Sequence, residues 1–271
     1  MTQPSIVFLD LDGTTLDGPA PKWFQKDPSE FTCDVLSKVN KIFPVVICTG
    51  RSANNNTRRI VDKIGLDSYI TWNGSEIYWK HELVYQAHAP KDVTAELVKD
   101  FEKYNLNVIF NSNKENSYTK NIISKQFMGH AKDTCKYWKD FDNNFNMQKA
   151  FVWPASFSPV KKLAKIFPIL QDKYGDKLEL TLAGENNVME ITPKDISKGN
   201  ADLWLCNYLN LDPNKAWHFG DSLNDASTKG KIGTLIAVAN ATDDLKVQAD
   251  VILDKTCDES AVAHHLKQFI K

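Results

Sequence analysis

The chain has 271 residues, of which 42% are hydrophobic and 25% charged, a composition typical of globular proteins with one large or two modest domains. The formal net charge of −1 provides no basic field for nucleic acid or anionic lipid, so neither is expected as a partner. The N-terminal residues lack the features of a signal peptide, and no apolar run approaches the roughly 20 residues that span a bilayer. We therefore expect a cytoplasmic protein.

The first 80 or so residues alternate between predicted strands and helices. Short apolar runs, typical of strands buried on both faces, occupy residues 5–9, 45–48 and 69–72. Helical spacing of apolar residues is found at 34–42, and a polar helix is predicted at 53–64. This alternation predicts a parallel sheet with right-handed βαβ connections.

The middle of the chain has a different pattern. Helical periodicity covers residues 93–104 and 160–174, whereas 178–182 and 188–191 are predicted strands around a hairpin turn at Gly184–Asn187. We interpret residues 83–193 as a separate α+β domain inserted into an α/β domain of residues 1–82 and 194–271.

The last 75 or so residues return to the alternating pattern. Predicted helices cover residues 198–209 and 259–270, and predicted strands cover 216–219, 235–238 and 251–253. The chain therefore closes its α/β domain with further strand and helix units.

Cysteine and histidine residues give no sign of a metal centre or a disulfide framework. The five cysteines are odd in number and none are spaced as CxxC. The six histidines show no ligand spacing, so we expect structural or surface positions for them. Any cation site in this chain is expected to use oxygen ligands.

Four short polar segments follow or open elements of the α/β domain. They read Asp10-Leu-Asp-Gly-Thr-Thr15, Thr49-Gly-Arg51, Ser197-Lys-Gly199 and Gly220-Asp-Ser-Leu-Asn-Asp225. Loops at the carboxyl ends of parallel strands gather at one edge of a sheet, so these segments are expected to meet there.

Four carboxylates are expected in that cluster, namely those of Asp10, Asp12, Asp221 and Asp225. Carboxylates brought together repel one another and raise one another's pKa unless a cation lies among them. All-oxygen ligation with few carboxylates favours Mg²⁺, which also binds water and substrate phosphate oxygens. We therefore predict a Mg²⁺ cofactor.

In order and character, the four segments resemble the motifs of the haloacid dehalogenase-like (HAD) hydrolase superfamily, and most closely its Cof-type sugar-phosphatase branch of subclass IIB. The resemblance covers the whole chain, including the size and position of the insertion. It implies a Rossmann-like core with a parallel sheet. It also implies that Asp10, the backbone carbonyl of Asp12, and Asp221 bind the metal ion, while Asp225 acts through water or behind these ligands.

The resemblance further implies phosphate-ester hydrolysis in two steps. Asp10 is expected to attack the phosphoryl group and form an aspartyl-phosphate. Asp12 is expected to protonate the leaving group and then to deprotonate the attacking water. The groups expected to bind the phosphate are the Thr49 hydroxyl, the Gly50 backbone, Lys198 and Asn224, the last either directly or by holding Lys198.

The insertion narrows the class of substrate. About 150 residues separate Thr49 from Lys198, far more than a βα connection needs. The insertion therefore resembles the type IIB cap of Cof-like proteins, which would exclude water and favour a small phosphorylated metabolite, such as a sugar phosphate, over a macromolecule.

Two alternatives to a phosphatase remain open at this stage. The three arginines, Arg51, Arg58 and Arg59, all lie outside the insertion, which disfavours a phosphohexomutase of the phosphomannomutase type that must hold a second phosphate. The other alternative is a catalytically idle protein that binds a phosphorylated ligand in the same pocket. The oligomeric state is not predicted.

Overall fold

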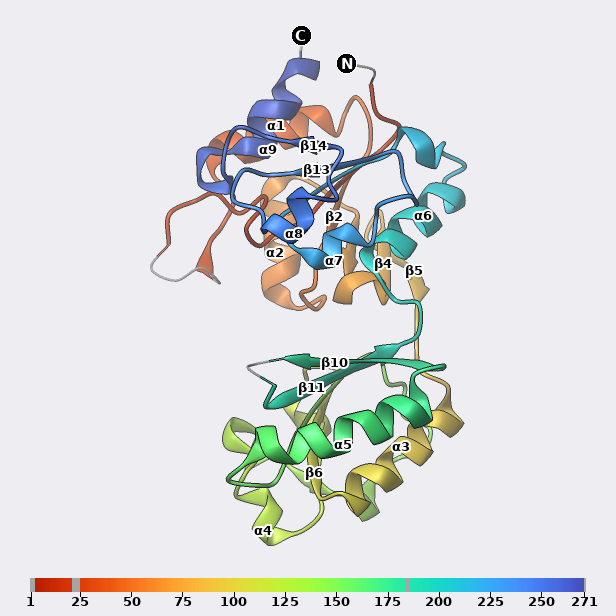
Figure 1. The fold of residues 1–271 in the computed structure, drawn as a ribbon. Helices are drawn as coiled ribbons and strands as arrows, with labels where there is room; N and C mark the ends of the chain where they lie inside the picture. The colour runs from red at the N-terminus through yellow and green to blue at the C-terminus, as the bar shows by residue number, and fades with distance from the viewer. Residues whose placement is uncertain (1–2, 21–24, 184–185, 271) are drawn as a thin grey trace. The chain divides into compact units, whose positions relative to one another are not determined.

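The computed structural model describes residues 3–20, 25–183 and 186–270 and separates the chain into two compact units (Figure 1). The first unit comprises residues 1–86 and 197–271, and the second comprises residues 87–196. The insertion thus begins and ends a few residues later than its expected bounds of 83 and 193. The reason is that strand β5 (Glu82–Gln86) still pairs with the sheet of the first unit.

The first unit contains an eight-stranded sheet in the order β14-β13-β12-β1-β2-β3-β4-β5. Its other strands are β1 (Val7–Leu9), β2 (Val45–Cys48), β3 (Tyr69–Thr71), β4 (Glu76–Trp79), β12 (Trp217–Gly220), β13 (Thr234–Ala237) and β14 (Val251–Ile252). The neighbours from β14 to β3 pair in parallel, whereas β4 and β5 extend the edge as antiparallel strands. The expected α/β fold with a mostly parallel sheet is confirmed.

Both faces of this sheet are covered, because its central strands are mostly apolar and are buried at every position. Along β1, Val7 and Leu9 pack into one hydrophobic cluster and Phe8 into another. The helices of this unit are α1 (Glu30–Val39), α2 (Asn55–Ile64), α6 (Lys198–Tyr208), α7 (Leu223–Ala226), α8 (Asp243–Lys246) and α9 (Ala261–Leu266). Since β strands buried on two faces alternate their side chains between two cores, the unit has three layers.

The bounds of several helices differ from those expected. Helix α1 begins at Glu30 instead of residue 34, because Ser29 caps it and Asp17 accepts hydrogen bonds from the Ser29 amide and hydroxyl. Helix α2 begins at Asn55 instead of residue 53, because the Asn54 side chain caps it. It ends at Ile64 as expected, before Gly65 with a φ of 79°. Helix α9 is shorter than the predicted 259–270, since two 3₁₀ turns flank it.

The second unit is an α+β structure with its own core. Its six-stranded sheet has the order β10-β11-β9-β6-β7-β8, with β6 (Leu106–Phe110), β7 (Ser117–Thr119), β8 (Lys136–Tyr137), β9 (Ala150–Pro154), β10 (Leu178–Ala183) and β11 (Val188–Pro193). Its helices are α3 (Lys91–Lys103), α4 (Ile122–Lys125) and α5 (Pro159–Tyr174), and side chains of α3 and α5 share one hydrophobic cluster with the sheet.

The predicted hairpin of the second unit is formed by β10 and β11, which pair antiparallel from Leu178 opposite Pro193 to Ala183 opposite Val188. Its turn at Gly184–Asn187 falls partly outside the described residues. Among the residues that the structure describes, no helix has the length and apolar character needed to cross a membrane.

Candidate active site

Asp10 lies directly after β1, in the middle of the first unit's sheet, and the residue is 5% exposed. Its backbone continues the pairing with β12, since its N–H donates to the Phe219 carbonyl over 3.0 Å. Thr15 donates to the Asp10 carbonyl over 2.5 Å, and Thr14 donates to the carboxylate over 3.3 Å. The DGTT turn therefore fixes the Asp10 carboxylate at the carboxyl end of the parallel strands.

Lys198 is the first residue of α6 and is fully buried. Its ammonium donates to Asp10 Oδ1 over 2.5 Å and to Asp225 Oδ1 over 2.7 Å. Burial lowers the pKa of Lys198, but the charges of Asp10 and Asp225 outweigh burial and raise the pKa above its ordinary value. Lys198 is therefore a fixed positive charge against the carboxylate of Asp10.

Asp221 follows β12 and approaches the DGTT turn closely. A Cβ atom at Gly13 would lie 2.2 Å from Asp221 Oδ2, and Gly13 has a φ of +78°, so only glycine fits this position. The carboxylate oxygens of Asp10, Asp221 and Asp225 lie within 4.8 Å of one another. The structure thus brings together three of the four carboxylates in the predicted cluster.

Two of these carboxylates bind protons more tightly than usual. Burial raises the pKa of Asp10 to about 7, although Lys198 opposes the shift. Burial also raises the pKa of Asp221 to about 6, and repulsion from Asp225 adds to that shift. A cation between Asp10 and Asp221 would remove the cost of ionising both.

Asp225 has a different environment, in which all its acceptor positions are used. Its Oδ1 contacts Lys198 and, over 2.9 Å, His218 Nε2, whereas its Oδ2 accepts the backbone N–H groups of Asp221 and Ser222, both over 3.0 Å. Burial would raise the pKa of Asp225, but Lys198 and His218 hold it well below its ordinary range. Because a carboxylate offers about four lone-pair positions, Asp225 has none left for a metal ion. These contacts fit its expected place behind the metal ligands, which stays a prediction.

Asp12 is held by a partner that the sequence did not indicate. Arg51 donates to both of its carboxylate oxygens, from Nε over 2.7 Å and from Nη2 over 2.5 Å. Two parallel hydrogen bonds between a guanidinium and a carboxylate are strong and directional. The arginine of the Thr49-Gly-Arg51 segment therefore fixes the orientation of the Asp12 carboxylate.

Thr49 and Gly50 follow β2, with Thr49 buried and Gly50 exposed. The Thr49 hydroxyl accepts from the Arg51 N–H over 3.2 Å, and the Thr49 carbonyl accepts from the Asn73 N–H over 3.0 Å. Asn224 donates to Asn73 Oδ1 over 3.2 Å. Asn224 therefore does not hold Lys198 here, as one of its two expected roles required, because Asp10 and Asp225 do so.

Three functional candidates were missed from the sequence: Arg51, Asn73 and His218. Arg51 belongs to the recognised Thr49-Gly-Arg51 segment but was given no role there. Asn73 follows β3, and that position was its only signal. His218 was expected to be structural or at the surface, yet it is fully buried within β12. Burial lowers the pKa of His218, but Asp202 and Asp225 outweigh burial and raise it to about 9.

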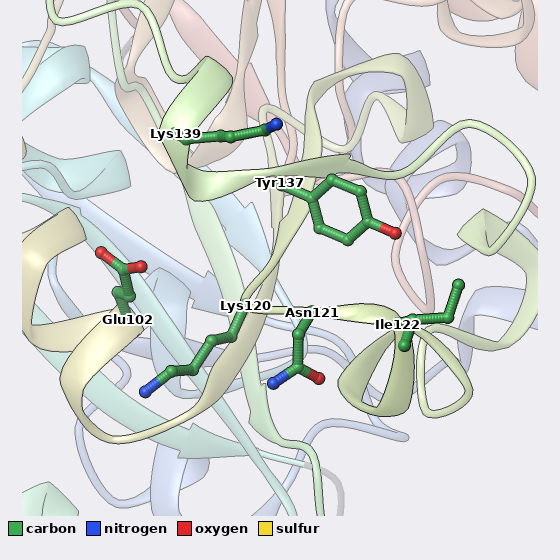
Figure 2. Close-up of a pocket in the computed structure, with 6 residues that line it drawn as sticks. All are labelled: Glu102, Lys120, Asn121, Ile122, Tyr137 and Lys139. Carbon is green, nitrogen blue, oxygen red and sulfur yellow. The ribbon is translucent and has the colours of Figure 1, made fainter.

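A separate pocket of about 320 Å³ lies in the second unit (Figure 2). Its lining residues come from α3, from the segment leading into α4, and from β8 and the turn after it: Glu102, Lys120, Asn121, Ile122, Tyr137 and Lys139. None of the residues predicted from the four motifs lines this pocket. It is therefore distinct from the carboxylate cluster.

Comparison with protein families places this arrangement in a known group. A model of the haloacid dehalogenase-like hydrolase family matches residues 7–266, a span that includes all four motif segments. The chain belongs to this family. The resemblance stated from the motifs is thus confirmed.

Individual relatives extend over the full length of the chain. The 5-amino-6-(5-phospho-D-ribitylamino)uracil phosphatase YwtE of Bacillus subtilis is 24% identical over 295 residues, which cover 97% of each chain. TM0651 of Thermotoga maritima is 20% identical, with a TM-score of 0.77 over 98% of this chain and 97% of the other. The HAD subclass IIB sugar phosphatase BT4131 is 19% identical, with a TM-score of 0.70 over 99% of each chain. The family and its phosphatase relatives identify the chain as a phosphoric monoester hydrolase.

Proposed function

We propose that this hydrolase is a Mg²⁺-dependent phosphatase that cleaves a small phosphorylated metabolite through an aspartyl-phosphate on Asp10. The observation that carries the proposal is the buried Asp10 carboxylate with one oxygen held by Lys198 and with Asp221 beside it. The lysine orients the carboxylate and offsets the charge of an approaching phosphate. A nucleophile held in this way is suited to attack on a phosphoryl group.

The residues present fit a divalent cation. The ligands that we propose are a carboxylate oxygen of Asp10, the backbone carbonyl of Asp12 and a carboxylate oxygen of Asp221. The raised pKa values of Asp10 and Asp221 support this set, because carboxylates that are buried, and close to other carboxylates, retain protons when no cation is present. When bound, Mg²⁺ would offset negative charge on the carboxylates and the phosphoryl oxygens.

Asp12 is the group that we propose as general acid and base. Arg51 donates two hydrogen bonds to the Asp12 carboxylate, and a carboxylate can take a proton from the water that cleaves the aspartyl-phosphate. Donation of a proton to the leaving group requires the neutral form. We therefore propose that Arg51 releases Asp12 when the substrate enters and binds it again before hydrolysis.

The phosphate is proposed to bind between the C-terminal end of β2 and the N-terminal end of α6. The Thr49 hydroxyl, the Gly50 backbone and the Lys198 ammonium would contact its oxygens, with Asn224 at the rim of the site. Asn73 supports this rim through its bond to Asn224 and its backbone bond to Thr49. These groups are donors, as a phosphoryl oxygen requires.

A sugar phosphate is the substrate class that we propose. One relative is named as a phosphatase of a phosphoribitylamino compound, and another is named as a sugar phosphatase. The second unit is proposed as a type IIB cap that selects the leaving group. A panel of phosphate esters tests this assignment: kcat/KM is expected to be highest for sugar or sugar-alcohol phosphates, and a preference for phosphopeptides would contradict it.

Removal of divalent metal is expected to abolish the hydrolysis of p-nitrophenyl phosphate. Dialysis against EDTA should reduce the rate to background, and added Mg²⁺ should restore it. Ca²⁺ should restore less, because it prefers six to eight oxygen ligands at longer distances. Mg²⁺ should also raise the thermal midpoint of unfolding, because it binds the folded state alone. Full activity in EDTA would contradict the metal requirement.

The affinity for Mg²⁺ is expected to fall as the pH is lowered from 8 to 6. Asp10 and Asp221, with pKa values of about 7 and about 6, must be deprotonated to bind metal, so protons compete as the pH approaches these values. The dissociation constant from calorimetry should rise roughly tenfold or more over this range. A constant that is unchanged between pH 8 and pH 6 would show that these carboxylates are not the ligands.

A further inference from the structure

A continuous chain of five buried, charged side chains leads away from the nucleophile into the core of the first unit. From Asp10 it passes to Lys198 over 2.5 Å, to Asp225 over 2.7 Å, to His218 over 2.9 Å and to Asp202 over 2.7 Å. Four of these side chains have no exposed surface, and Asp10 is 5% exposed. The proposed chemistry uses the first two members and leaves the function of the last two open.

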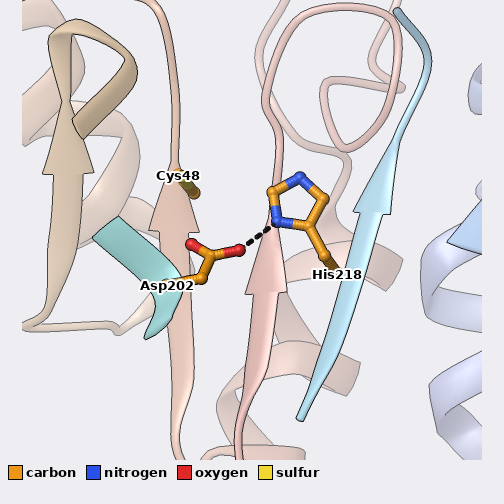
Figure 3. Close-up of side chains that lie close together, drawn as sticks. All are labelled: Cys48, Asp202 and His218. Carbon is orange, nitrogen blue, oxygen red and sulfur yellow. Dashed lines mark hydrogen bonds and ion pairs between the residues drawn. The ribbon is translucent and has the colours of Figure 1, made fainter. Parts of the chain in front are cut away.

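His218 is the centre of the inner part of this chain. It lies on β12 with apolar neighbours on the strand, and each of its ring nitrogens contacts a carboxylate oxygen: Nδ1 that of Asp202 (Figure 3) and Nε2 that of Asp225. Because ionised carboxylates only accept hydrogen bonds, both nitrogens must donate. Asp202 thereby fixes the orientation of the ring, and the ring presents an N–H to Asp225.

A metal ion does not explain this cluster. Cys48 Sγ, an Asp202 oxygen and a His218 nitrogen lie within 4.8 Å of one another, a compact set for a cation (Figure 3). However, both ring nitrogens are already engaged by carboxylates, and a ligating nitrogen cannot also donate a proton there. The contacts are those of a buried ion pair.

Such a pair costs free energy in the interior compared with apolar residues of similar volume. The ion pair also restrains the carboxylate of Asp225. With His218 on Oδ1 and two backbone N–H groups on Oδ2, this carboxylate cannot rotate, and Oδ1 is directed at Lys198. Lys198 in turn contacts the nucleophile.

We propose that His218, oriented by Asp202, is a positioning residue for phosphate-ester hydrolysis: it fixes the carboxylate of Asp225 and, through it, the ammonium of Lys198 against Asp10. The inference rests on the proposed function, since it concerns the same nucleophile. It assigns to His218 and Asp202 an effect on the rate of hydrolysis that is separate from their effect on the stability of the fold.

Two substitutions of His218 separate these roles. In His218→Gln the amide nitrogen can replace Nε2 and keep the donor to Asp225, whereas in His218→Asn it can replace Nδ1 and keep only the donor to Asp202. The Asn variant is expected to lose kcat by about 10- to 100-fold and the Gln variant by no more than about threefold, with KM nearly unchanged in both. The assay is p-nitrophenyl phosphate hydrolysis at saturating Mg²⁺.

Stability should follow the opposite order. The Gln variant removes the ring N–H that contacts Asp202 Oδ2, so this fully buried carboxylate keeps only the neighbouring Cys48 thiol in place of the histidine. In the Asn variant Asp225 keeps Lys198. Urea unfolding should therefore show the Gln variant to be the less stable and yet the more active of the two.

Glu76→Gln is a matched control. Glu76 is a buried carboxylate on β4 of the same unit, and it accepts hydrogen bonds from the side chains of Thr71 and Gln86. This variant should lose stability and keep its kcat. Equal kcat in the two His218 variants, or activity that follows stability in all three, would overturn the proposal. An inactive wild-type protein would instead overturn the proposed function.

Discussion

The Asp10→Asn variant is expected to lose phosphate-ester hydrolysis by about 10⁴-fold or more, as when a nucleophile is removed from other enzymes. The amide has nearly the same shape but cannot form an acyl-phosphate in the proposed reaction. It also removes one proposed metal ligand, so nucleophile and cation are lost together. The measurement is the steady-state rate with p-nitrophenyl phosphate and excess Mg²⁺.

The fold should survive this substitution, because the amide replaces a carboxylate that burial already drives toward its neutral form by raising the pKa of Asp10. Asp34→Asn serves as the control, since Asp34 is an exposed partner in an ion pair with Lys38 on α1. That variant should keep the full rate. A rate of Asp10→Asn within tenfold of the wild type would rule out Asp10 as the nucleophile.

The Lys198→Met variant is expected to lose both activity and stability. Methionine approximately fills the volume of the lysine stem but leaves the Asp10 and Asp225 carboxylates without the cation between them. Removing one partner of a buried ion pair typically lowers the free energy of unfolding by about 3–5 kcal/mol. Urea unfolding in EDTA and p-nitrophenyl phosphate hydrolysis in Mg²⁺ measure the two losses.

Lys38→Met is the matched control for stability. Lys38 pairs with Asp34 at the surface of α1, where both side chains are more than half exposed, so its loss should change the free energy of unfolding by less than about 0.5 kcal/mol. Adding Asp225→Asn to Lys198→Met should recover part of the stability and none of the activity. If Lys198→Met is as stable and active as the wild type, the buried contacts have neither role.

The sequence predicts the strands of the first unit well where they are apolar at every position. Val45–Cys48 is a strand over the predicted residues, and the predicted strand at 69–72 ends one residue earlier as β3. Such runs are buried on both faces, so their local pattern has one solution in a parallel sheet. The edge strands β4 and β5 are partly exposed and mixed in character, and the boundary of the insertion was placed inside β5 for that reason.

The grouping of Asp10, Asp221 and Lys198 also followed from the sequence, because each adjoins a core strand or begins a helix at the same edge of the sheet. The side chains that contact Asp12 and Asp225 did not follow from the sequence. Arg51 lies 39 residues from Asp12, and Lys198 lies 27 residues from Asp225. Both carboxylates were assigned from their motifs without knowledge of the side chain that faces them.

The sequence by itself determined the family, the α/β core with its insertion, and the set of polar residues at the sheet edge, because these depend on local apolar patterns and on short motifs. The contact of Lys198 with Asp10 was also expected from the motifs. The tertiary structure decided which residues the other carboxylates contact: Arg51 for Asp12, and both Lys198 and His218 for Asp225. The physical reason is distance along the chain. Hydrogen bonds between buried charges are set by packing of elements far apart in sequence, and no local pattern encodes that packing.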